Sequence, residues 1–190
     1  MRIVGGKHKG RRLMAPAGRD VRPTSERVRE ALFNILAHGA LGSSLPEGAR
    51  VLDVFAGSGA LGLEALSRGA DHVSFIENDR RTLPLLRQNA EGLSTKRVAV
   101  YQRDATLPGP VPTAPGLPAD LVLLDAPYGK GLSEAALEAL QDRGWLAQAI
   151  ACVELSTRES FAAPPGFALL DDRRYGSTRL VILRTSTPPE

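Results

Sequence analysis

From Arg50 onward, short apolar runs alternate with segments in which apolar residues recur every three or four positions. The runs are typical of buried strands, and the longer segments are typical of helices that pack through one face. Their alternation predicts an α/β fold built on a mainly parallel sheet. Strands are expected near residues 50–55, 72–77, 97–102, 120–125, 149–155, 167–174 and 178–184, and helices near 60–68, 80–92, 132–142 and 157–161.

Two connections refine this layout. Only the turn Tyr175-Gly-Ser-Thr178 separates the last two expected strands, so these two strands should be antiparallel. Residues 107–118 contain five prolines and two glycines, which exclude a normal crossover helix. This loop is expected to be extended and to lie inside one domain.

The N-terminal segment follows a different pattern. Residues 2–4 and 12–14 flank a glycine-rich turn and predict a short β-hairpin. A helix should follow, opened near Pro23 with Thr24 or Ser25 as N-cap and ended by Gly39. Its apolar positions are Val28, Leu32, Ile35 and Leu36, and its hydrophilic face carries Glu26, Arg27 and Glu30. Residues 1–45 are therefore predicted to form an extension on a Rossmann-like domain of residues 46–190.

Composition is ordinary for a globular protein, with 43% hydrophobic and 24% charged residues in 190 positions. No apolar run approaches the roughly 18 residues of a membrane span, and the first residues lack the apolar core of a secretion signal. The single cysteine, Cys152, lies among apolar neighbours and is expected to be a buried strand thiol. A cytoplasmic location, a monomer and no metal site are the expectations.

The charge is unevenly distributed. Residues 1–30 hold nine basic and three acidic residues, a net charge of +6, so the other 160 residues carry −3 of the total of +3. The basic residues are Arg2, Lys7, Lys9, Arg11, Arg12, Arg19, Arg22, Arg27 and Arg29. A basic arm on a slightly acidic body favours a polyanionic partner such as a nucleic acid. The alternative is a solvated basic face.

The segment Gly57-Ser-Gly-Ala-Leu-Gly62 matches the pattern G-x-G-x-x-G between an expected strand and an expected helix. Glycines at these positions let a ligand lie close to the backbone. Glu77 ends the next strand, where its carboxylate can accept hydrogen bonds from ribose hydroxyls. Enzymes that bind NAD share these features, so the glycine motif alone does not identify the cofactor.

Acidic residues at successive strand ends favour S-adenosylmethionine, which carries a sulfonium and an ammonium group. Asp53 lies inside the first strand and Asp104 follows the third, where it can accept the adenine amino group. Each acid singly could be a turn or strand-end residue. A doubly wound sheet with an antiparallel last strand is also the usual layout of S-adenosylmethionine-dependent methyltransferases. The expected cofactor-binding residues are Asp53, Phe55, Ala56, Gly57, Ser58, Gly59, Glu77, Asn78, Asp104 and Ala105.

The turn Asp125-Ala126-Pro127-Tyr128 follows the buried run Leu121-Val-Leu-Leu124. Ligands of open α/β sheets bind at the carboxyl ends of strands. The Asp125 carboxylate and the Ala126 carbonyl could accept both hydrogens of an exocyclic base amine and direct its lone pair at a methyl donor. Tyr128 could stack on the base. These four residues are the predicted catalytic set, although a plain β-turn with a surface tyrosine is the alternative.

With both motifs in place, the chain resembles the bacterial small-subunit ribosomal RNA guanine-N2-methyltransferases of the RsmD type. The resemblance runs almost end to end, through Arg2-Ile-Val-Gly-Gly, Gly10-Arg-Arg-Leu, the glycine loop and Gly144-Trp-Leu. Its most specific part is the block from Arg22-Pro-Thr-Ser-Glu-Arg to Asn34. The family turn is Asp-Pro-Pro-Phe or Asp-Pro-Pro-Tyr, so Ala126 replaces a proline. The carbonyl survives, Pro127 still favours an extended Ala126, and activity is expected to persist.

The resemblance implies methylation of the N2 amine of one guanine in 16S rRNA, within an assembled or partly assembled 30S subunit. It also implies that the N-terminal extension contacts rRNA phosphates. The predicted RNA-binding residues are Lys7, Lys9, Arg11, Arg12, Arg22, Thr24, Arg27 and Arg29.

Three alternatives remain at this stage. A DNA adenine-N6 methyltransferase uses the same turn, but 190 residues leave little room for a target-recognition region. An NAD-dependent oxidoreductase fits the glycine loop, but no catalytic histidine or lysine and no second domain are apparent. A non-catalytic RNA-binding or assembly protein could retain the same fold.

Overall fold

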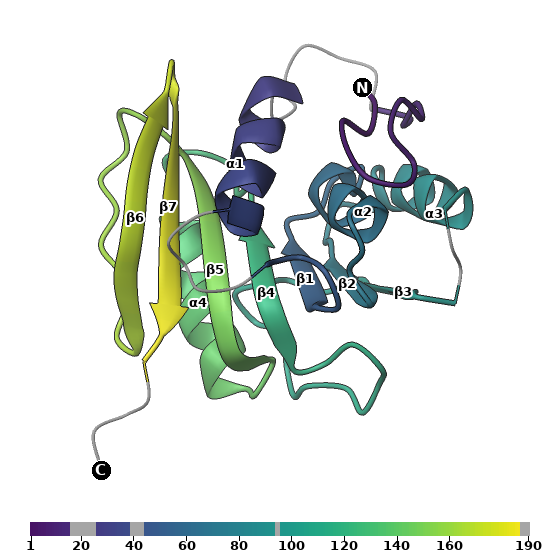
Figure 1. The fold of residues 1–190 in the computed structure, drawn as a ribbon. Helices are drawn as coiled ribbons and strands as arrows, with labels where there is room; N and C mark the ends of the chain where they lie inside the picture. The colour runs from purple at the N-terminus through teal and green to yellow at the C-terminus, as the bar shows by residue number, and fades with distance from the viewer. Residues whose placement is uncertain (16–25, 39–43, 94–95, 187–190) are drawn as a thin grey trace.

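The computed structural model describes residues 1–15, 26–38, 44–93 and 96–186, which form a seven-stranded sheet with helices on both faces (Figure 1). The helices are α1 (Glu26–His38), α2 (Ala60–Ser67), α3 (Leu83–Glu91) and α4 (Leu132–Asp142). The strands are β1 (Arg50–Val54), β2 (His72–Ile76), β3 (Val98–Tyr101), β4 (Ala119–Leu124), β5 (Leu146–Ser156), β6 (Phe167–Tyr175) and β7 (Thr178–Thr185).

The strand order is β3-β2-β1-β4-β5-β7-β6. The first five strands of this order are parallel, and β7 runs antiparallel to both β5 and β6. The predicted parallel sheet with an antiparallel final hairpin is therefore confirmed. From β1 the chain winds outward to β2 and β3 and then returns to β4, so the order reverses between β1 and β4. Such a reversal is the place where open α/β sheets bind their ligands.

Two expected helices differ from the structure. The helix expected over 157–161 is wrong: the Glu159 N–H donates to the Ser156 carbonyl, and the Glu159 carboxylate accepts the Ser156 N–H, so the chain closes as a turn. The helix expected from residue 80 begins at Leu83. The Thr82 N–H and hydroxyl both donate to the Asp79 carbonyl, which closes a turn before the helix. Pro84 occupies one of the first helical positions, where an N–H would have no partner inside the helix.

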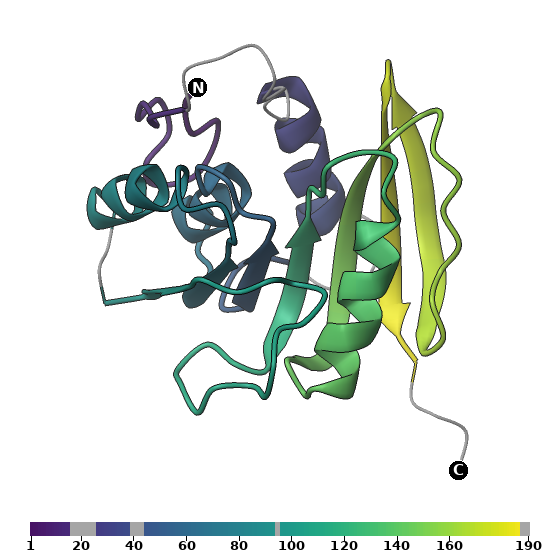
Figure 2. The same ribbon diagram turned by 180° about the vertical axis from the view of Figure 1, so that it is seen from behind.

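Three helices cover one face of the sheet and one covers the other. In Figure 1, α1, α2 and α3 lie in front of the strands, while α4 lies behind them and comes forward in Figure 2. Each face has its own apolar cluster, because alternate residues of each strand point to opposite sides. No helix in the described part of the chain is long and apolar enough to span a bilayer.

The proline-rich loop replaces a helix on the α4 face. Residues 107–118 contain neither helix nor strand, as predicted. Val111 and Leu117 pack against the same apolar cluster as α4. The loop is held by the Trp145 indole N–H, which donates to the Gly109 carbonyl at 2.9 Å, and by Arg103, which donates to the Pro108 and Pro110 carbonyls.

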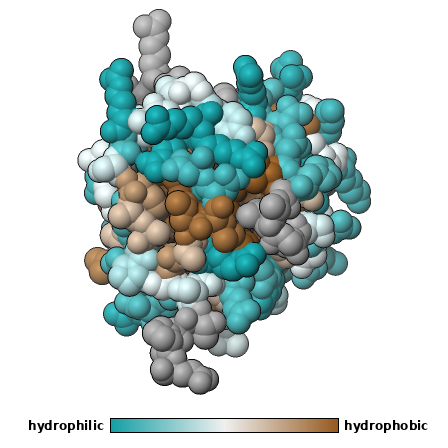
Figure 3. All heavy atoms as spheres, turned by 60° about the vertical axis from the view of Figure 1, so that its left-hand side comes forward, coloured by the Kyte–Doolittle hydropathy of each residue, from teal (hydrophilic) through white to brown (hydrophobic). Residues whose placement is uncertain are grey.

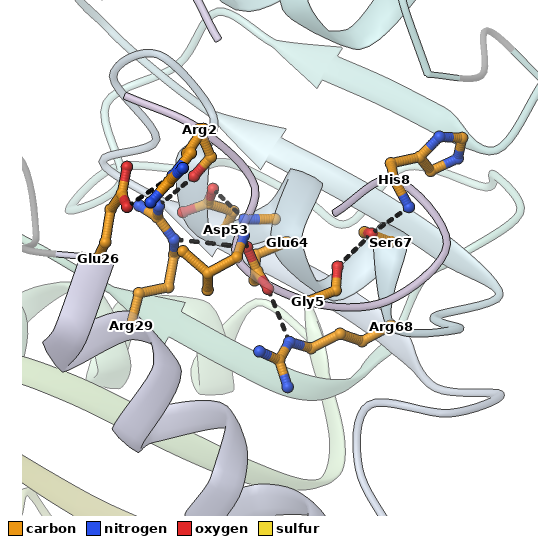
Figure 4. Close-up of polar contacts among 11 residues, drawn as sticks. Arg2, Gly5, His8, Glu26, Arg29, Asp53, Glu64, Ser67 and Arg68 are labelled. Atoms are coloured by element: carbon orange, nitrogen blue, oxygen red, sulfur yellow. Dashed lines mark hydrogen bonds and ion pairs between the residues drawn. The ribbon is translucent and has the colours of Figure 1, made fainter. Parts of the chain in front are cut away.

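The N-terminal arm, residues 1–15, lies on α2 (Figure 4). The predicted hairpin forms only one isolated bridge, between Arg2 and Arg12. Its strands do not extend because the donors in the middle of the arm turn to α2 instead. The Val4 N–H donates to Glu64 at 2.8 Å, and the N–H groups of Lys7 and His8 donate to the Ser67 carbonyl and hydroxyl.

The arm can approach the end of α2 because it carries glycine at the point of contact. Gly6 has a φ of +73°, and a Cβ at this position would lie 1.9 Å from the Ser67 carbonyl oxygen. The Ser67 hydroxyl in turn donates to the Gly5 carbonyl at 2.6 Å. The arm is therefore fixed to the body by backbone contacts that a side chain would block.

Arg29 lies inside the protein, so its prediction as an RNA-binding residue is wrong. Its side chain is fully buried between α1 and α2, where its Nε lies 3.5 Å from a Glu64 carboxylate oxygen. Its Nη2 donates to the Arg2 carbonyl at 2.6 Å. Burial lowers the pKa of Arg29, and the neighbouring Glu64 opposes that shift. Arg29 therefore links the arm, α1 and α2 through buried polar contacts.

Replacing Arg29 should destabilise the fold strongly. Among the described residues, Arg29→Ala leaves the buried Glu64 carboxylate with Arg68 and the Val4 N–H as partners, at a cost of about 3–5 kcal/mol in the free energy of unfolding. Arg27→Ala, on the exposed side of the same helix, should change it by less than about 0.5 kcal/mol. Urea unfolding measures both. Equal losses in the two variants would contradict the internal role of Arg29.

Candidate active site

The glycine loop connects β1 to α2, and its three motif glycines have different physical roles. A Cβ on Gly59 would lie 2.4 Å from the Leu86 side chain, and a Cβ on Gly62 would lie 2.5 Å from Phe75. These two glycines let α2 approach α3 and β2 closely. Gly57 has a φ of +53°, and a Cβ there would meet nothing within 4 Å. Gly57 therefore leaves open space above the backbone, as a bound ligand requires.

Phe55 precedes these glycines with a φ of +59°, a left-handed conformation that costs a bulky residue about 1–3 kcal/mol. Its ring packs against the cluster on the α4 face, which holds the residue in place. The Ala56 N–H donates to the Ile76 carbonyl and the Gly59 N–H to the Ala56 carbonyl. The loop is thus held in one shape without any ligand contact.

Asp53 lies at the centre of this arrangement. Its side chain is 2% exposed, and its carboxylate accepts the Gly62 N–H at 2.8 Å. Burial raises the pKa of Asp53 well above its ordinary value, the Gly62 hydrogen bond opposes this, and the charges of Asp125 and Glu77 add to it. Three acids from the ends of β1, β2 and β4 therefore lie within electrostatic reach of one another.

Glu77 connects the end of β2 to the glycine loop. Its two carboxylate oxygens accept the Gly57 and Asp79 N–H groups, both at 2.6 Å. Glu77 is 9% exposed, so its carboxylate is held rigidly at the edge of the open space beside Gly57. Asn78, next in the chain, is exposed.

The remaining predicted cofactor residues occupy the same edge of the sheet. Asp104 is exposed after β3, and its Oδ1 accepts the Thr106 N–H and hydroxyl hydrogens. Ala105 is buried beside it. Ser58 is buried in the glycine loop. The end of β3 is tied to that of β2, because the Glu77 N–H donates to the Tyr101 carbonyl.

The turn at residues 125–128 follows β4, the strand next to β1 in the sheet. Ala126 is buried, whereas Tyr128 is 42% exposed. The Tyr128 hydroxyl lies 3.5 Å from a carboxylate oxygen of the buried Glu154 on β5. The Gly129 N–H donates to one oxygen of Glu159, whose other oxygen accepts the Ser156 N–H at 2.7 Å. The turn is thus anchored to the end of β5.

Three residues at this site were not predicted from the sequence. Glu154 is the one carboxylate in the apolar run 149–155, which is a signal that could have identified it, whereas Glu159 and Asn89 carry no comparable signal. The Asn89 side chain accepts the Met14 N–H and donates to the carbonyls of Met14 and Ser58. It therefore joins the end of the N-terminal arm to the glycine loop.

The predicted RNA-binding residues have three outcomes. Lys7, Lys9, Arg11 and Arg12 are exposed on the arm, and Arg27 is exposed on α1. Arg29 is buried, as described above. Arg22 and Thr24, together with the proposed cap Ser25 and the helix end at Gly39, lie outside the described residues.

Residues 1–184 match the family described as "Conserved hypothetical protein 95". The chain is 39% identical over 166 residues to ribosomal RNA small subunit methyltransferase D of Escherichia coli K12, covering 87% of this chain and 79% of that protein. Among solved structures it is similar to the putative methyltransferase YhhF of E. coli (TM-score 0.80, 35% identity, 97% of each chain). The putative methylase HI0767 of Haemophilus influenzae is also similar (TM-score 0.75, 31% identity, 97% of each chain).

Removing the Asp53 charge should stabilise the fold in a pH-dependent way. The raised pKa means that the folded protein keeps a proton that the unfolded chain loses as the pH rises above about 4. Wild-type stability therefore falls with rising pH, by about 1.4 kcal/mol for each unit of pKa difference, until the raised pKa is passed. Asp53→Asn lacks this penalty and still offers an oxygen to the Gly62 N–H.

Urea unfolding of both proteins between pH 4 and pH 8 measures the effect. The stability advantage of Asp53→Asn should be small at pH 4 and grow towards pH 8. Glu138→Gln, an exposed change on α4, is the control and should show a constant difference near zero. An Asp53→Asn advantage that does not vary with pH would show that the buried charge is not the cause.

Proposed function

The chain belongs to the family described as "Conserved hypothetical protein 95" and is an RsmD-type methyltransferase; on this premise we propose that it methylates the N2 amine of one guanine in 16S rRNA. The methyl donor is S-adenosylmethionine. The observation that carries the proposal is the position of the Asp125–Tyr128 turn beside the glycine loop, on adjacent strands where the strand order reverses. This arrangement sets an acceptor for a planar amine next to a cofactor loop.

The residues present fit this cofactor. Gly57 leaves open space above the loop backbone, and Glu77 at its edge can accept the ribose hydroxyl hydrogens. Asp125 adds negative charge where the sulfonium and ammonium groups would lie, and the positive charge of those groups would favour ionisation of the buried Asp53. A positively charged ligand offsets the mutual repulsion of these acids, which are unfavourable neighbours without it. Asp104, exposed at the end of β3, can accept the adenine amine.

The turn provides the chemistry for the acceptor base. S-adenosylmethionine supplies an electrophilic methyl group on a sulfonium. The guanine amine is a weak nucleophile, and the Asp125 carboxylate and Ala126 carbonyl hold its two hydrogens so that the lone pair faces that methyl group. The same carboxylate stabilises the positive charge that develops on the nitrogen. After transfer, the acidic amine loses one proton to solvent, so no strong base is required.

Ala126 replaces a proline of the family turn, and contacts from outside the turn restrain the backbone in its place. The Glu159 carboxylate holds the Gly129 N–H, and the Tyr128 hydroxyl lies beside Glu154. These contacts restrain the backbone that a second proline would otherwise fix. Tyr128 keeps enough exposure for its ring to stack on a base, a contact of about 1–3 kcal/mol.

Residues 1–45 serve as an rRNA-contacting extension of the methyltransferase domain over 46–190. Lys7, Lys9, Arg11 and Arg12 are exposed on an arm that is fixed to α2, so their charges are presented on a rigid support. Cations that neutralise phosphates release counterions, which makes binding strong at low salt. A partly or fully assembled 30S subunit is the proposed substrate.

The decisive variant is Asp125→Ala. With tritiated S-adenosylmethionine and 30S subunits from cells that lack the modification, its rate of methyl transfer should fall by about 10²–10³-fold. Its affinity for S-adenosylhomocysteine should fall far less than its rate of methyl transfer, because Asp125 contributes charge to the cofactor site but a direct contact only to the base. Glu138→Ala, exposed on α4, should retain the wild-type rate.

Two outcomes would redirect the assignment. If Asp125→Ala methylated 30S subunits as fast as the wild type, the turn would not be catalytic. If the wild type labelled DNA but not 30S subunits, an adenine in DNA would be the better substrate.

A further inference from the structure

Three segments meet at the end of the sheet next to the catalytic turn. The turn continues into Gly129, whose N–H donates to Glu159 in the β5–β6 connection. The Thr157 N–H donates to the Ser177 carbonyl at 3.0 Å, and Arg179 donates to the Glu159 carbonyl at 3.3 Å. The tip of the β6–β7 hairpin, residues 175–178, therefore lies beside the turn that would receive the base.

This end of the sheet is rich in cations, and its carboxylates are already engaged. Arg173 pairs with Asp171 at 2.8 Å and Arg179 pairs with Asp172 at 2.7 Å. The hydrogen bond from Arg179 lowers the pKa of Asp172. Both oxygens of Glu159 accept backbone N–H groups.

Three further cations lie at this end of the sheet, and we name them the hairpin rim: Lys130, Arg158 and Arg174. All three are exposed, and no salt bridge to them forms among the described residues. Lys130 follows Gly129 and Arg158 precedes Glu159, so the Gly129–Glu159 hydrogen bond brings them to the same place.

Arg174 stands directly opposite Arg179 in the β6–β7 ladder. Like charges directly opposite each other across two antiparallel strands are unfavourable. Asp172 forms a salt bridge with Arg179 and lies within electrostatic reach of Arg174, so two guanidinium groups share one carboxylate. An anionic partner would remove the remaining repulsion, so this pair indicates a surface that binds negative charge.

The hairpin rim and the N-terminal arm lie on opposite sides of the catalytic turn. In Figures 1 and 2 the arm lies over α2 and α3, while the tip of the β6–β7 hairpin rises at the other end of the sheet, beyond β5. Figure 3 shows the face that includes this hairpin, with hydrophilic side chains gathered towards its top and apolar ones at mid-height. A strand that crosses the site would meet cations on both sides of Tyr128.

We propose that the hairpin rim is a second RNA-binding surface, which holds backbone phosphates of the rRNA on the side of the target guanine away from the arm. The inference rests on the proposed function. A base that leaves its stack to reach an active site loses stacking energy, and contacts to the flanking backbone offset that loss. With the arm alone, the strand would be held on one side only and the base would be less constrained.

The test compares two double variants that remove equal charge. Arg158→Gln/Arg174→Gln alters the hairpin rim, and Lys130 is kept because it lies two residues from Tyr128. Lys96→Gln/Arg143→Gln is the control. Both residues are exposed, and they precede the amino ends of β3 and β5, whereas the catalytic turn follows the carboxyl end of β4. Wild type and both variants are assayed with unmodified 30S subunits for KM, kcat and direct binding across a series of KCl concentrations.

The rim variant should raise KM for 30S subunits by about tenfold and weaken direct binding to the same extent. Two lost phosphate contacts should also make the slope of log affinity against log salt shallower by about 1.4, at ~0.7 per contact for single-stranded RNA. Affinity for S-adenosylhomocysteine and kcat at saturating substrate should be unchanged. The control should stay within about twofold of wild type.

Equal shifts in both variants would overturn the inference, because net charge would then explain them, and so would no shift in the rim variant. These outcomes are separate from failure of the proposed function. That function fails if the wild type methylates no guanine in 30S subunits, whereas the binding measurement still compares the rim variant with its control.

Discussion

Close approach between α2 and the sheet is the constraint on which the site depends. Gly59 and Gly62 carry no Cβ where Leu86 and Phe75 already fill the space, so the helix can lie against α3 and β2. That position brings the Gly62 N–H to the buried Asp53 carboxylate. The second half of the same helix offers Glu64 and Ser67 to the N-terminal arm. One short, almost fully buried helix therefore joins the cofactor loop to the proposed RNA-binding extension.

The same arrangement concentrates unfavourable electrostatics at one edge of the sheet. Asp53, Glu77 and Asp125 come from three neighbouring strands, and their mutual repulsion adds to the cost of burying Asp53. Phe55 holds a strained backbone at the same edge. A fold tolerates such features where the surrounding structure fixes them and where a ligand of opposite charge relieves them. The two apolar clusters and the hydrogen bonds of α2 to Asp53 and to the N-terminal arm supply that support.

The sequence pattern predicted the parallel sheet with its antiparallel final hairpin and the edge where the site lies, because these features depend on periodicity and on connection lengths. Alternating apolar runs identify the strands, and motifs after β1 and β4 must meet at the carboxyl edge of a parallel sheet. The pattern could not identify the partner of a polar group. Arg29 shares a helical face with Phe33 and Leu36, which is a signal of burial, yet its positive charge favoured an RNA contact. The arm was expected to form a hairpin, and it pairs with itself only near Arg2 and Arg12, because the N–H groups of Val4, Lys7 and His8 donate to α2. Glu159 and Asn89 act through contacts between distant segments, which local sequence does not encode.

The most direct test of the account is mass spectrometry of 16S rRNA from the source cells with and without the gene for this chain. The account predicts that a single guanine carries an N2-methyl group in cells with the gene and lacks it in cells without the gene. Identical methylation in both samples, or a difference confined to adenines or to DNA, would contradict the assignment of the Asp125–Tyr128 turn to a guanine of the small ribosomal subunit.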